Sequence, residues 1–188
     1  PTAITEPMEA KLHSKTILIV DDTPANIDVL SELLKDFKRK VATHGSQALA
    51  LANGSQPPDL ILLDIEMPDM DGFEVCRQLK ANPATERIPV IFLTSNMEKR
   101  TTVQGFKAGA CDFMTKPFDP DELMVRLRTQ LELAESREQL EQMIEQMEIS
   151  SALLKDSSEE LNLQKAALEE SRQKSDSLLL NVLPEAIA

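Results

Sequence analysis

Short apolar runs alternate with amphipathic helical stretches through the first two thirds of this chain, and this alternation constrains the fold most strongly. The predicted strands are Thr16–Val20, Lys40–Thr43, Leu60–Ile65, Pro89–Thr94 and Ala110–Thr115. The predicted helices are Ala25–Lys35, Ser46–Ala52, Gly72–Leu79, Glu98–Lys107 and a continuous helix from Pro120 onward. Apolar strands that alternate with helices predict an α/β fold, a doubly wound five-stranded parallel sheet covered on both faces.

The aromatic residues and the charges are unevenly distributed along the chain. All six Phe lie between positions 37 and 118, and there is no Trp or Tyr, so we expect the core in that part. The net charge is −12, and residues 132–188 hold 13 Asp and Glu against 5 Lys and Arg. A segment this acidic argues against nucleic acid and against an anionic membrane surface as partners.

Targeting signals and cysteine clusters are both missing from the sequence. The apolar runs are too short to span a bilayer, and the N-terminus has no apolar signal-peptide region. It also lacks an initiator Met, which suggests a trimmed piece of a longer protein. Cys76 and Cys111 are not in a ligand-spaced cluster, so we interpret them as reduced thiols that serve as small apolar residues. These features favour a cytoplasmic location.

Polar residues that could carry chemistry follow four of the predicted strands. In a parallel sheet, ligands bind at the carboxyl ends of the strands. The residues there are Asp21 and Asp22, Asp64, Thr94 and Ser95, and Lys116 before Pro117. Three converging carboxylates repel one another unless a cation neutralises them, and oxygen ligands completed by water suit Mg²⁺. A carboxylate beside a hydroxyl, an ammonium and a metal can accept a phosphoryl group in line.

About 125 residues from the N-terminus resemble the receiver domain of two-component response regulators. The matching motifs are I-L-I-V-D-D (17–22), L-L-D-I-E-M-P-D-M-D-G (62–72), F-L-T-S (92–95) and D-F-M-T-K-P-F (112–118). The resemblance implies a flavodoxin-like fold and a sensor histidine kinase or phosphotransfer protein as partner. It implies that Asp64 is the phosphoacceptor and that Mg²⁺ is held by Asp64 together with Asp22, Asp21 (mainly through water) and the main-chain carbonyl of Glu66. It also implies that Thr94 and Lys116 bind phosphoryl oxygens and that Thr94 and Phe113 form the switch. The small Ser95 then leaves room for a backbone N–H to approach the phosphate.

Each of these residues alone has a simpler interpretation. Asp21 and Asp22 could be helix N-cap residues, Lys116 a surface lysine and Phe113 core packing. Their joint occurrence at successive strand ends favours the phosphoacceptor interpretation, and the Lys–Pro step is a reasonable position for a cis peptide. The two histidines, His13 and His44, lie outside the long helix, which favours a phosphate receiver over a donor.

A seven-residue repeat runs along the helix after Leu131. One seam position holds Leu133, Leu140, Met147, Leu154, Leu161, Leu168, Ser175 and Val182, and its companion holds Arg137, Ile144, Ser151, Ser158, Lys165, Arg172 and Leu179. This repeat predicts a coiled coil, and Leu at the first position favours a parallel homodimer through residues 132–183. A merely stable tether is the alternative, although the polar companion position suits a seam that changes its packing in response to a signal.

The final segment, S-L-L-L-N-V-L-P-E-A-I-A (177–188), resembles the short element that precedes the catalytic domain of class III nucleotidyl cyclases. The resemblance implies a cyclase domain beyond Ala188, so that this chain would carry no catalytic output of its own. The alternatives are an apolar helix end, a stand-alone adaptor, or another output such as a protein phosphatase. The predicted organisation is an N-terminal arm (1–14), a receiver (15–131), a coiled-coil signalling helix (132–176) and this transducer element (177–188).

Overall fold

Five parallel strands form the sheet of this protein. The structure, a computed structural model, describes residues 12–95 and 99–182 of the 188-residue chain. The strands are β1 (Thr16–Val20), β2 (Lys38–Ala42), β3 (Leu60–Asp64), β4 (Val90–Thr94) and β5 (Asp112–Thr115), in the spatial order β2-β1-β3-β4-β5. This order confirms the predicted flavodoxin-like sheet, and its switch point lies between β1 and β3, where such folds bind ligands.

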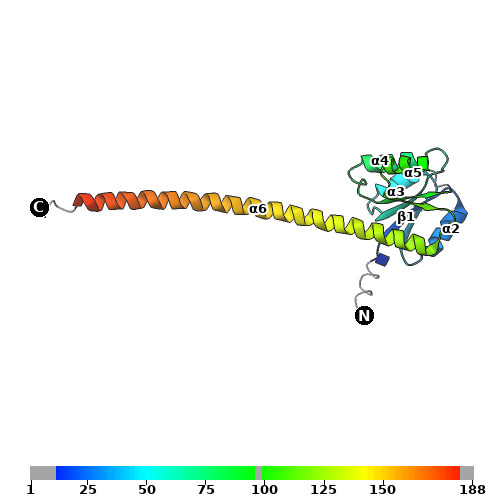
Figure 1. Cartoon of the computed structure of the whole chain (residues 1–188), viewed down its shortest axis with the longest axis horizontal. Helices are drawn as coiled ribbons and strands as arrows, with labels where there is room; N and C mark the ends of the chain where they lie inside the picture. The colour runs from blue at the N-terminus through cyan, green and yellow to red at the C-terminus, as the bar shows by residue number, and fades with distance from the viewer. Residues whose placement is uncertain (1–11, 96–98, 183–188) are drawn as a thin grey trace, which may run out of the picture. The chain divides into compact units, whose positions relative to one another are not determined.

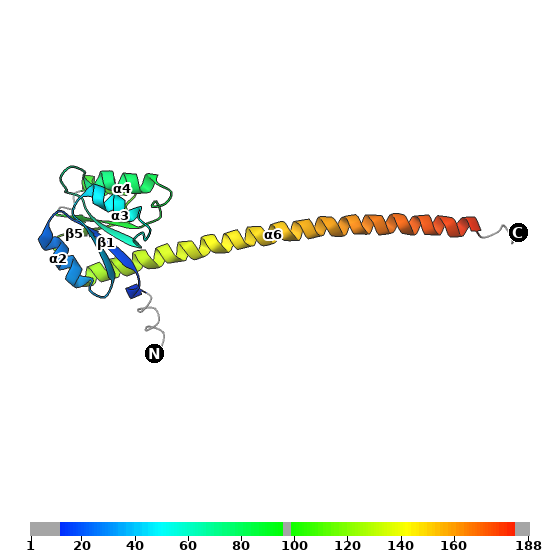
Figure 2. The same cartoon turned by 180° about the vertical axis from the view of Figure 1, so that it is seen from behind.

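Helices cover both faces of the sheet, as Figure 1 shows from one side and Figure 2 from behind. They are α2 (Pro24–Leu33), α3 (Gly45–Ala52), α4 (Gly72–Ala81), α5 (Lys99–Ala108) and α6 (Pro120–Val182). Helices α3, α4 and α5 lie on one face, and α2 and the first turns of α6 lie on the other.

Side chains of the central strands alternate between two apolar cores, because successive residues of a strand point to opposite faces. The core under α3, α4 and α5 includes Leu18, Val20, Ile61, Leu63, Val90 and Phe92. The core under α2 and α6 includes Ile17, Ile19, Leu60, Leu62, Ile91 and Leu93. Both clusters are buried, which explains why these strands are apolar throughout.

Helix α6 is anchored on the sheet by its first three turns. Leu123, Leu127 and Leu131 recur every fourth residue and are buried against the strands. The first compact unit of the chain ends at Arg137, and the second, which begins at Glu138, is the remainder of this 63-residue helix. The predicted long helix is therefore confirmed, whereas its pairing into a coiled coil stays a prediction.

Four predicted boundaries were wrong by two residues. α4 ends at Ala81 rather than Leu79, because the helix continues past its last buried residue. β2 begins at Lys38 rather than Lys40, because Thr16 of β1 already pairs with Lys38, and a charged start is typical of an edge strand. α2 ends at Leu33 rather than Lys35, where Leu34 caps it. β5 begins at Asp112 rather than Ala110, because the backbone N–H of Ala110 still bonds Gly105 in the turn that ends α5.

Several predicted features lie outside the described residues. They include most of the N-terminal arm, the predicted first residue of the fourth helix (Glu98), and residues 183–188 of the C-terminal segment. Over the part of the chain that the structure describes, none of the helices combines the length and apolar character needed to cross a bilayer.

Candidate phosphoacceptor site

The strand register brings four strand ends to one edge of the sheet. The paired residues at this edge are Val20 with Leu63, Asp64 with Leu93, and Thr94 with Thr115. Asp21 and Lys116 directly follow β1 and β5, while Asp64 and Thr94 end β3 and β4. The residues singled out in the sequence therefore share one edge, as the parallel sheet requires.

Three carboxylates form a cluster at this edge. Asp21, Asp22 and Asp64 each offer an oxygen within 4.8 Å of the others. Asp21 and Asp64 are buried and Asp22 is exposed, so the cluster opens to solvent on one side. This combination of two buried acids and one exposed acid gives an incoming ligand access to the site.

Lys116 bridges the two buried acids. Its Nζ lies 2.8 Å from Asp21 Oδ2 and 2.9 Å from Asp64 Oδ2. Its backbone N–H donates to the carbonyl of Thr94 over 2.8 Å, which ties the end of β5 to the end of β4. The Lys116–Pro117 peptide is cis, as predicted. The ammonium is therefore already placed beside the carboxylate that the sequence marks as the nucleophile.

The pKa values of this pair are both raised. Burial raises the pKa of Asp64 above its ordinary value, and the Asp21 charge adds to this effect, while the hydrogen bond from Lys116 opposes it. Burial by itself lowers the pKa of Lys116, but the hydrogen bonds and charges of Asp21 and Asp64 outweigh it, and the net pKa is raised. Lys116 thus stays protonated, as a group that binds phosphoryl oxygens must.

Asp21 is held in place by residues that the sequence analysis did not single out. Asn26 Nδ2 donates to Asp21 Oδ1 and Oδ2 over 2.9 Å and 3.1 Å, and the backbone N–H of Thr23 donates to Asp21 Oδ1 over 2.9 Å. Asn26 follows in the first turn of α2, where its amide can reach back to the strand end. The sequence did offer a signal for Asn26: its side-chain amide stands in the first turn of the helix that follows the acidic end of β1.

The loop after β3 brings α4 back close to Asp64. A Cβ on Gly72 would lie 2.3 Å from the carbonyl oxygen of Asp64, so only glycine fits there. Asp71 caps α4 by accepting from the N–H of Glu74 at 2.7 Å, and Asp69 adopts a φ of 69° within the loop. The D-x-D-G end of the quoted motif therefore has a steric explanation as well as a capping one.

The donor set suits a divalent cation. Three ionised carboxylates outnumber the bridging ammonium of Lys116 by two charges, which Mg²⁺ would neutralise. All three offer oxygen atoms, and the exposed Asp22 leaves an open side for water ligands. Glu66 gives Asp64 a backbone hydrogen bond, so its main chain lies beside the cluster. These residues therefore fit magnesium.

The sequence of residues 17–128 matches the response regulator receiver domain family. This match spans more than half of the chain and includes every strand-end residue described above. The chain belongs to that family.

Two curated relatives of this receiver show the extent of the similarity. The response regulator PleD of Caulobacter vibrioides is 44% identical over 118 residues, which cover 62% of this chain and 26% of that protein. A probable cyclic di-GMP phosphodiesterase of Vibrio cholerae is 44% identical over 128 residues, covering 68% of this chain and 29% of that protein. The matched segment thus spans little more than a quarter of the length of each of these two relatives.

A solved receiver supports the metal assignment. The receiver domain of a sensor histidine kinase from Pseudomonas aeruginosa PAO1 was solved with a magnesium ion coordinated in its active-site cleft. It is 31% identical, superposes with a TM-score of 0.59, and the match covers 63% of this chain and 98% of that one. The acidic cluster of the present receiver is the corresponding candidate magnesium site.

Phe113 of the receiver lies inside a column of aromatic rings. Its ring centroid is 5.6 Å from that of Phe92 and 5.0 Å from that of Phe106, and Phe73 continues the column on the other side of Phe92 at 5.2 Å. Phe113 is buried and Phe106 is half exposed. A Cβ on Gly105 would lie 2.3 Å from Phe113 Cζ, so the inward position of this ring depends on that glycine.

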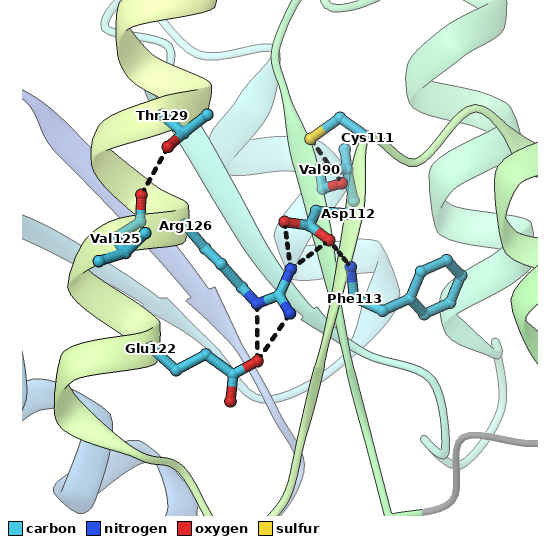
Figure 3. A network of polar contacts seen from close by, with 8 residues as sticks. All are labelled: Val90, Cys111, Asp112, Phe113, Glu122, Val125, Arg126 and Thr129. Atoms are coloured by element: carbon cyan, nitrogen blue, oxygen red, sulfur yellow. Dashed lines mark hydrogen bonds and ion pairs between the residues drawn. The ribbon is translucent and has the colours of Figure 1, made fainter.

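A polar network connects β5 to α6 on the side of β5 away from the ring of Phe113, as Figure 3 shows. Arg126 Nη1 donates to both carboxylate oxygens of Asp112 over 2.7 Å, and its Nε donates to Glu122 over 2.8 Å. Asp112 also accepts from the backbone N–H of Phe113 at 2.8 Å. These bonds raise the pKa of Arg126, and the bond to Asp112 contributes most. The strand that carries Phe113 is therefore fastened to the helix that leaves the receiver.

Proposed function

We propose that this receiver accepts a phosphoryl group on Asp64 from a sensor histidine kinase or a phosphotransfer protein. The observation that carries the proposal is the Lys116 ammonium, which lies within 3 Å of both buried carboxylates at the shared strand edge. A carboxylate oxygen of Asp64 forms a new bond to phosphorus, and the bond from phosphorus to the donor imidazole breaks. The imidazole leaves with that electron pair, and the acyl phosphate remains on Asp64.

The other strand-end residues stabilise the transferred group in this proposal. The Lys116 ammonium exchanges its contact with Asp64 for a phosphoryl oxygen, and the hydroxyl of Thr94, at the end of the neighbouring strand, donates to another. The small side chain of Ser95 leaves space for a backbone N–H to approach the phosphate.

Asp21, Asp22, Asp64 and the main-chain carbonyl of Glu66 would hold Mg²⁺. When bound, the ion supplies positive charge between the acidic oxygens and the incoming phosphoryl oxygens. Asn26 and Thr23 keep the carboxylate of Asp21 turned toward this position. Asp22 is exposed, and its Oδ1 accepts a hydrogen bond from the hydroxyl of Thr23 over 3.2 Å.

The switch in this proposal consists of Thr94 and Phe113. When Thr94 moves toward the phosphoryl group, it changes the space beside the buried ring of Phe113, which is surrounded by Phe92, Phe106 and Gly105. Arg126 and Asp112 connect the same strand to α6. Phosphorylation can therefore reach the long helix through β5.

We propose that residues 132–176 form a coiled-coil signalling helix that pairs in parallel with a second copy through residues 132–183. Its support is the exposure of the whole leucine-rich position, since Leu133, Leu140, Met147, Leu154, Leu161 and Leu168 are each at least 53% exposed. Isolated apolar side chains are common on surfaces, but six in one seven-residue repeat need a partner helix. The proposed limits of the arm (1–14), receiver (15–131) and transducer element (177–188) follow from this division.

The proposed output is a class III nucleotidyl cyclase joined to the C-terminal segment in a cytoplasmic protein. Its support is the resemblance of residues 177–188 to the element before such catalytic domains. Similar receivers occur in proteins named for other outputs, including a cyclic di-GMP phosphodiesterase, so the receiver alone does not select the output. A stand-alone dimeric adaptor or a protein phosphatase regulator is the second candidate. The acidic helix disfavours a DNA-binding output.

The phosphoacceptor proposal is tested by intact mass after incubation with Mg²⁺ and a small-molecule phosphodonor. The wild-type chain is expected to gain one phosphoryl mass, and Asp64→Asn is expected to gain none. Asp28→Asn, an exposed acid on α2, serves as the matched control and is expected to label like the wild type. Equal labelling of Asp64→Asn and the control would contradict the proposal.

A further inference from the structure

The exposed leucine row of α6 begins directly after the last residue of the helix that packs on the sheet. Leu131 is the last buried leucine of the receiver core, and Leu133, two residues later, is 59% exposed. Two residues of an α-helix correspond to a rotation of about 200°. The face with Leu133 therefore points away from the face that packs on the sheet, and a second helix can lie along it without displacing the receiver contacts.

The two positions beside the leucine row differ strongly along the helix. In heptad terms the leucine row is position d, and positions a and g flank it across a two-stranded seam. Met143 at g and Ile144 at a are apolar and 58% and 55% exposed. The other g–a pairs over residues 136–172 are polar: Ser136–Arg137, Ser150–Ser151, Ser157–Ser158, Gln164–Lys165 and Ser171–Arg172. Between residues 136 and 176, only one stretch is thus apolar at a, d and g together.

Cations at position a have acidic neighbours on their own helix. Arg137, Lys165 and Arg172 are followed four residues later, at position e, by Glu141, Glu169 and Asp176. Arg172 Nε already lies 3.9 Å from Asp176 Oδ2. Side chains four residues apart on a helix face one another, so each cation can reach its carboxylate. When two copies pair in parallel and in register, like cations meet across the seam, and each layer is neutral.

An antiparallel pair loses this compensation. Position a then faces position d of the partner, so a cation at a faces a leucine and must be buried against it. The serines at g beside Arg137 and Arg172 leave space for the long side chains to reach solvent only when a faces a. The polar layers therefore favour the parallel orientation more than they add affinity. A shift by one heptad would place Ile144 opposite Arg137 or Ser151, so the Ile144 layer sets the register.

We propose that a second copy of this chain docks on α6 through one apolar clamp, formed by Leu140, Met143, Ile144 and Met147, which sets the register, while the polar layers from Ser151 to Asp176 favour the parallel orientation. Between residues 136 and 176, the clamp is the one part of the seam that can bury a continuous apolar surface. This inference deepens the proposed dimer and rests on it. It places a strong contact in the first turns after the receiver and leaves residues 151–176 weakly paired.

The clamp is tested by the dimer dissociation constant of the chain, measured by sedimentation equilibrium. Ile144→Asn is expected to raise it by about tenfold or more, because it places an amide in the apolar clamp. The matched control is Ile149→Asn, which makes the same change five residues away at a side chain 57% exposed but off the seam. The control is expected to stay within about twofold of the wild type, and Lys165→Leu is expected to tighten the dimer. Equal effects of the two Asn variants would overturn the clamp.

The register is tested by cysteine cross-linking, and the phosphoacceptor assay separates the two proposals. Leu140→Cys and Leu168→Cys are each expected to form a disulfide with their own copy under an added oxidant, whereas a disulfide only in a mixture of the two variants would overturn the parallel alignment. Phosphoryl loading of the same samples gives an independent readout. If the dimer behaves as expected but Asp64 does not load, the phosphoacceptor proposal fails alone; if Asp64 loads and the chain is a monomer at all concentrations, the clamp fails alone.

Discussion

Lys116 illustrates how single residues in this receiver are fixed by their surroundings. Its ammonium contacts Asp21 and Asp64, and its backbone N–H contacts Thr94. A buried carboxylate that loses its cation keeps the cost of burial without compensation. Asp64 is therefore positioned by its neighbours rather than by its own strand alone, and the same applies to Asp21 through Asn26.

At the residue scale, Gly105→Ala is expected to destabilise the receiver by about 1–3 kcal/mol, because the added methyl group overlaps the ring of Phe113. The measurement is urea unfolding. Gly54→Ala is the control, since the nearest neighbour of its Cβ would be the carbonyl oxygen of Leu51 at 3.4 Å, an ordinary contact distance. Phe113→Leu in the same chain is expected to relieve part of the loss, which makes the two effects non-additive. Additive effects would show that the ring does not depend on Gly105.

The thiols give a second residue-scale prediction, on pH. Burial raises the pKa of Cys76 and of Cys111 to about 11, and both are free thiols, as predicted. Between pH 9 and 11 the unfolded chain releases these protons while the folded chain retains them. The stability contributed by each thiol is fully present below pH 9 and is lost at up to about 1.4 kcal/mol per pH unit as the pH rises through that window.

Urea unfolding of the wild type and of a Cys76→Ala, Cys111→Ala variant across pH 7.5 to about 10.5 checks this behaviour. The stability of the wild type is expected to fall more steeply above pH 9 than that of the variant. Parallel curves for the two chains would show that the folded thiols titrate like unfolded ones.

At the element scale, α6 has two faces with different tasks. Leu127 is fully buried against the sheet, whereas Val125, two residues earlier, is 66% exposed. Leu127→Ala is expected to lower the free energy of unfolding by about 2–5 kcal/mol, because it leaves a cavity under the helix. Val125→Ala is expected to change it by less than about 0.5 kcal/mol. Urea unfolding measures both, and similar losses in the two variants would mean that the helix is not anchored as described.

The elements that the sequence predicted best are those whose packing is uniform. β1 and the start of α6 were predicted to the residue, because their apolar periods are unbroken. The start of β2 was missed, since its exposed Lys38 and Arg39 do not show a strand period at a sheet edge. Ala110 was misplaced for a different reason: Gly109, with a φ of 98°, lets the α5 turn continue past it. A turn that is closed by backbone hydrogen bonds leaves no pattern of apolar residues in the sequence.

At the scale of the whole molecule, the site was predictable and its supports were not. Asp21, Asp64, Thr94 and Lys116 were found because strand ends in a parallel sheet must share an edge. Asn26 was not found, because an amide that reaches back from a helix to an acid depends on where the loop places it. The heptad pattern predicts that two copies pair through α6. The structure of a single chain does not test this prediction, because the contact needs a second chain.

The receiver and the long helix together suggest a division of work. The receiver holds the buried chemistry, and the helix holds the exposed apolar row. Arg126 and Asp112 join β5 to the start of that helix. We propose that phosphorylation acts at one edge of the sheet and is transmitted to the helix through β5, which carries Phe113 and directly precedes Lys116.

The central claim is that Asp64, and no other carboxylate of the acidic cluster, carries the phosphoryl group. The most direct measurement is to load the chain in the presence of Mg²⁺, reduce the acyl phosphate with borohydride and locate the modified residue by peptide mass spectrometry. The account predicts modification of Asp64 alone, dependent on the divalent cation. Modification of Asp21 or Asp22, or of Asp64 to the same extent after the cation is chelated, would contradict it.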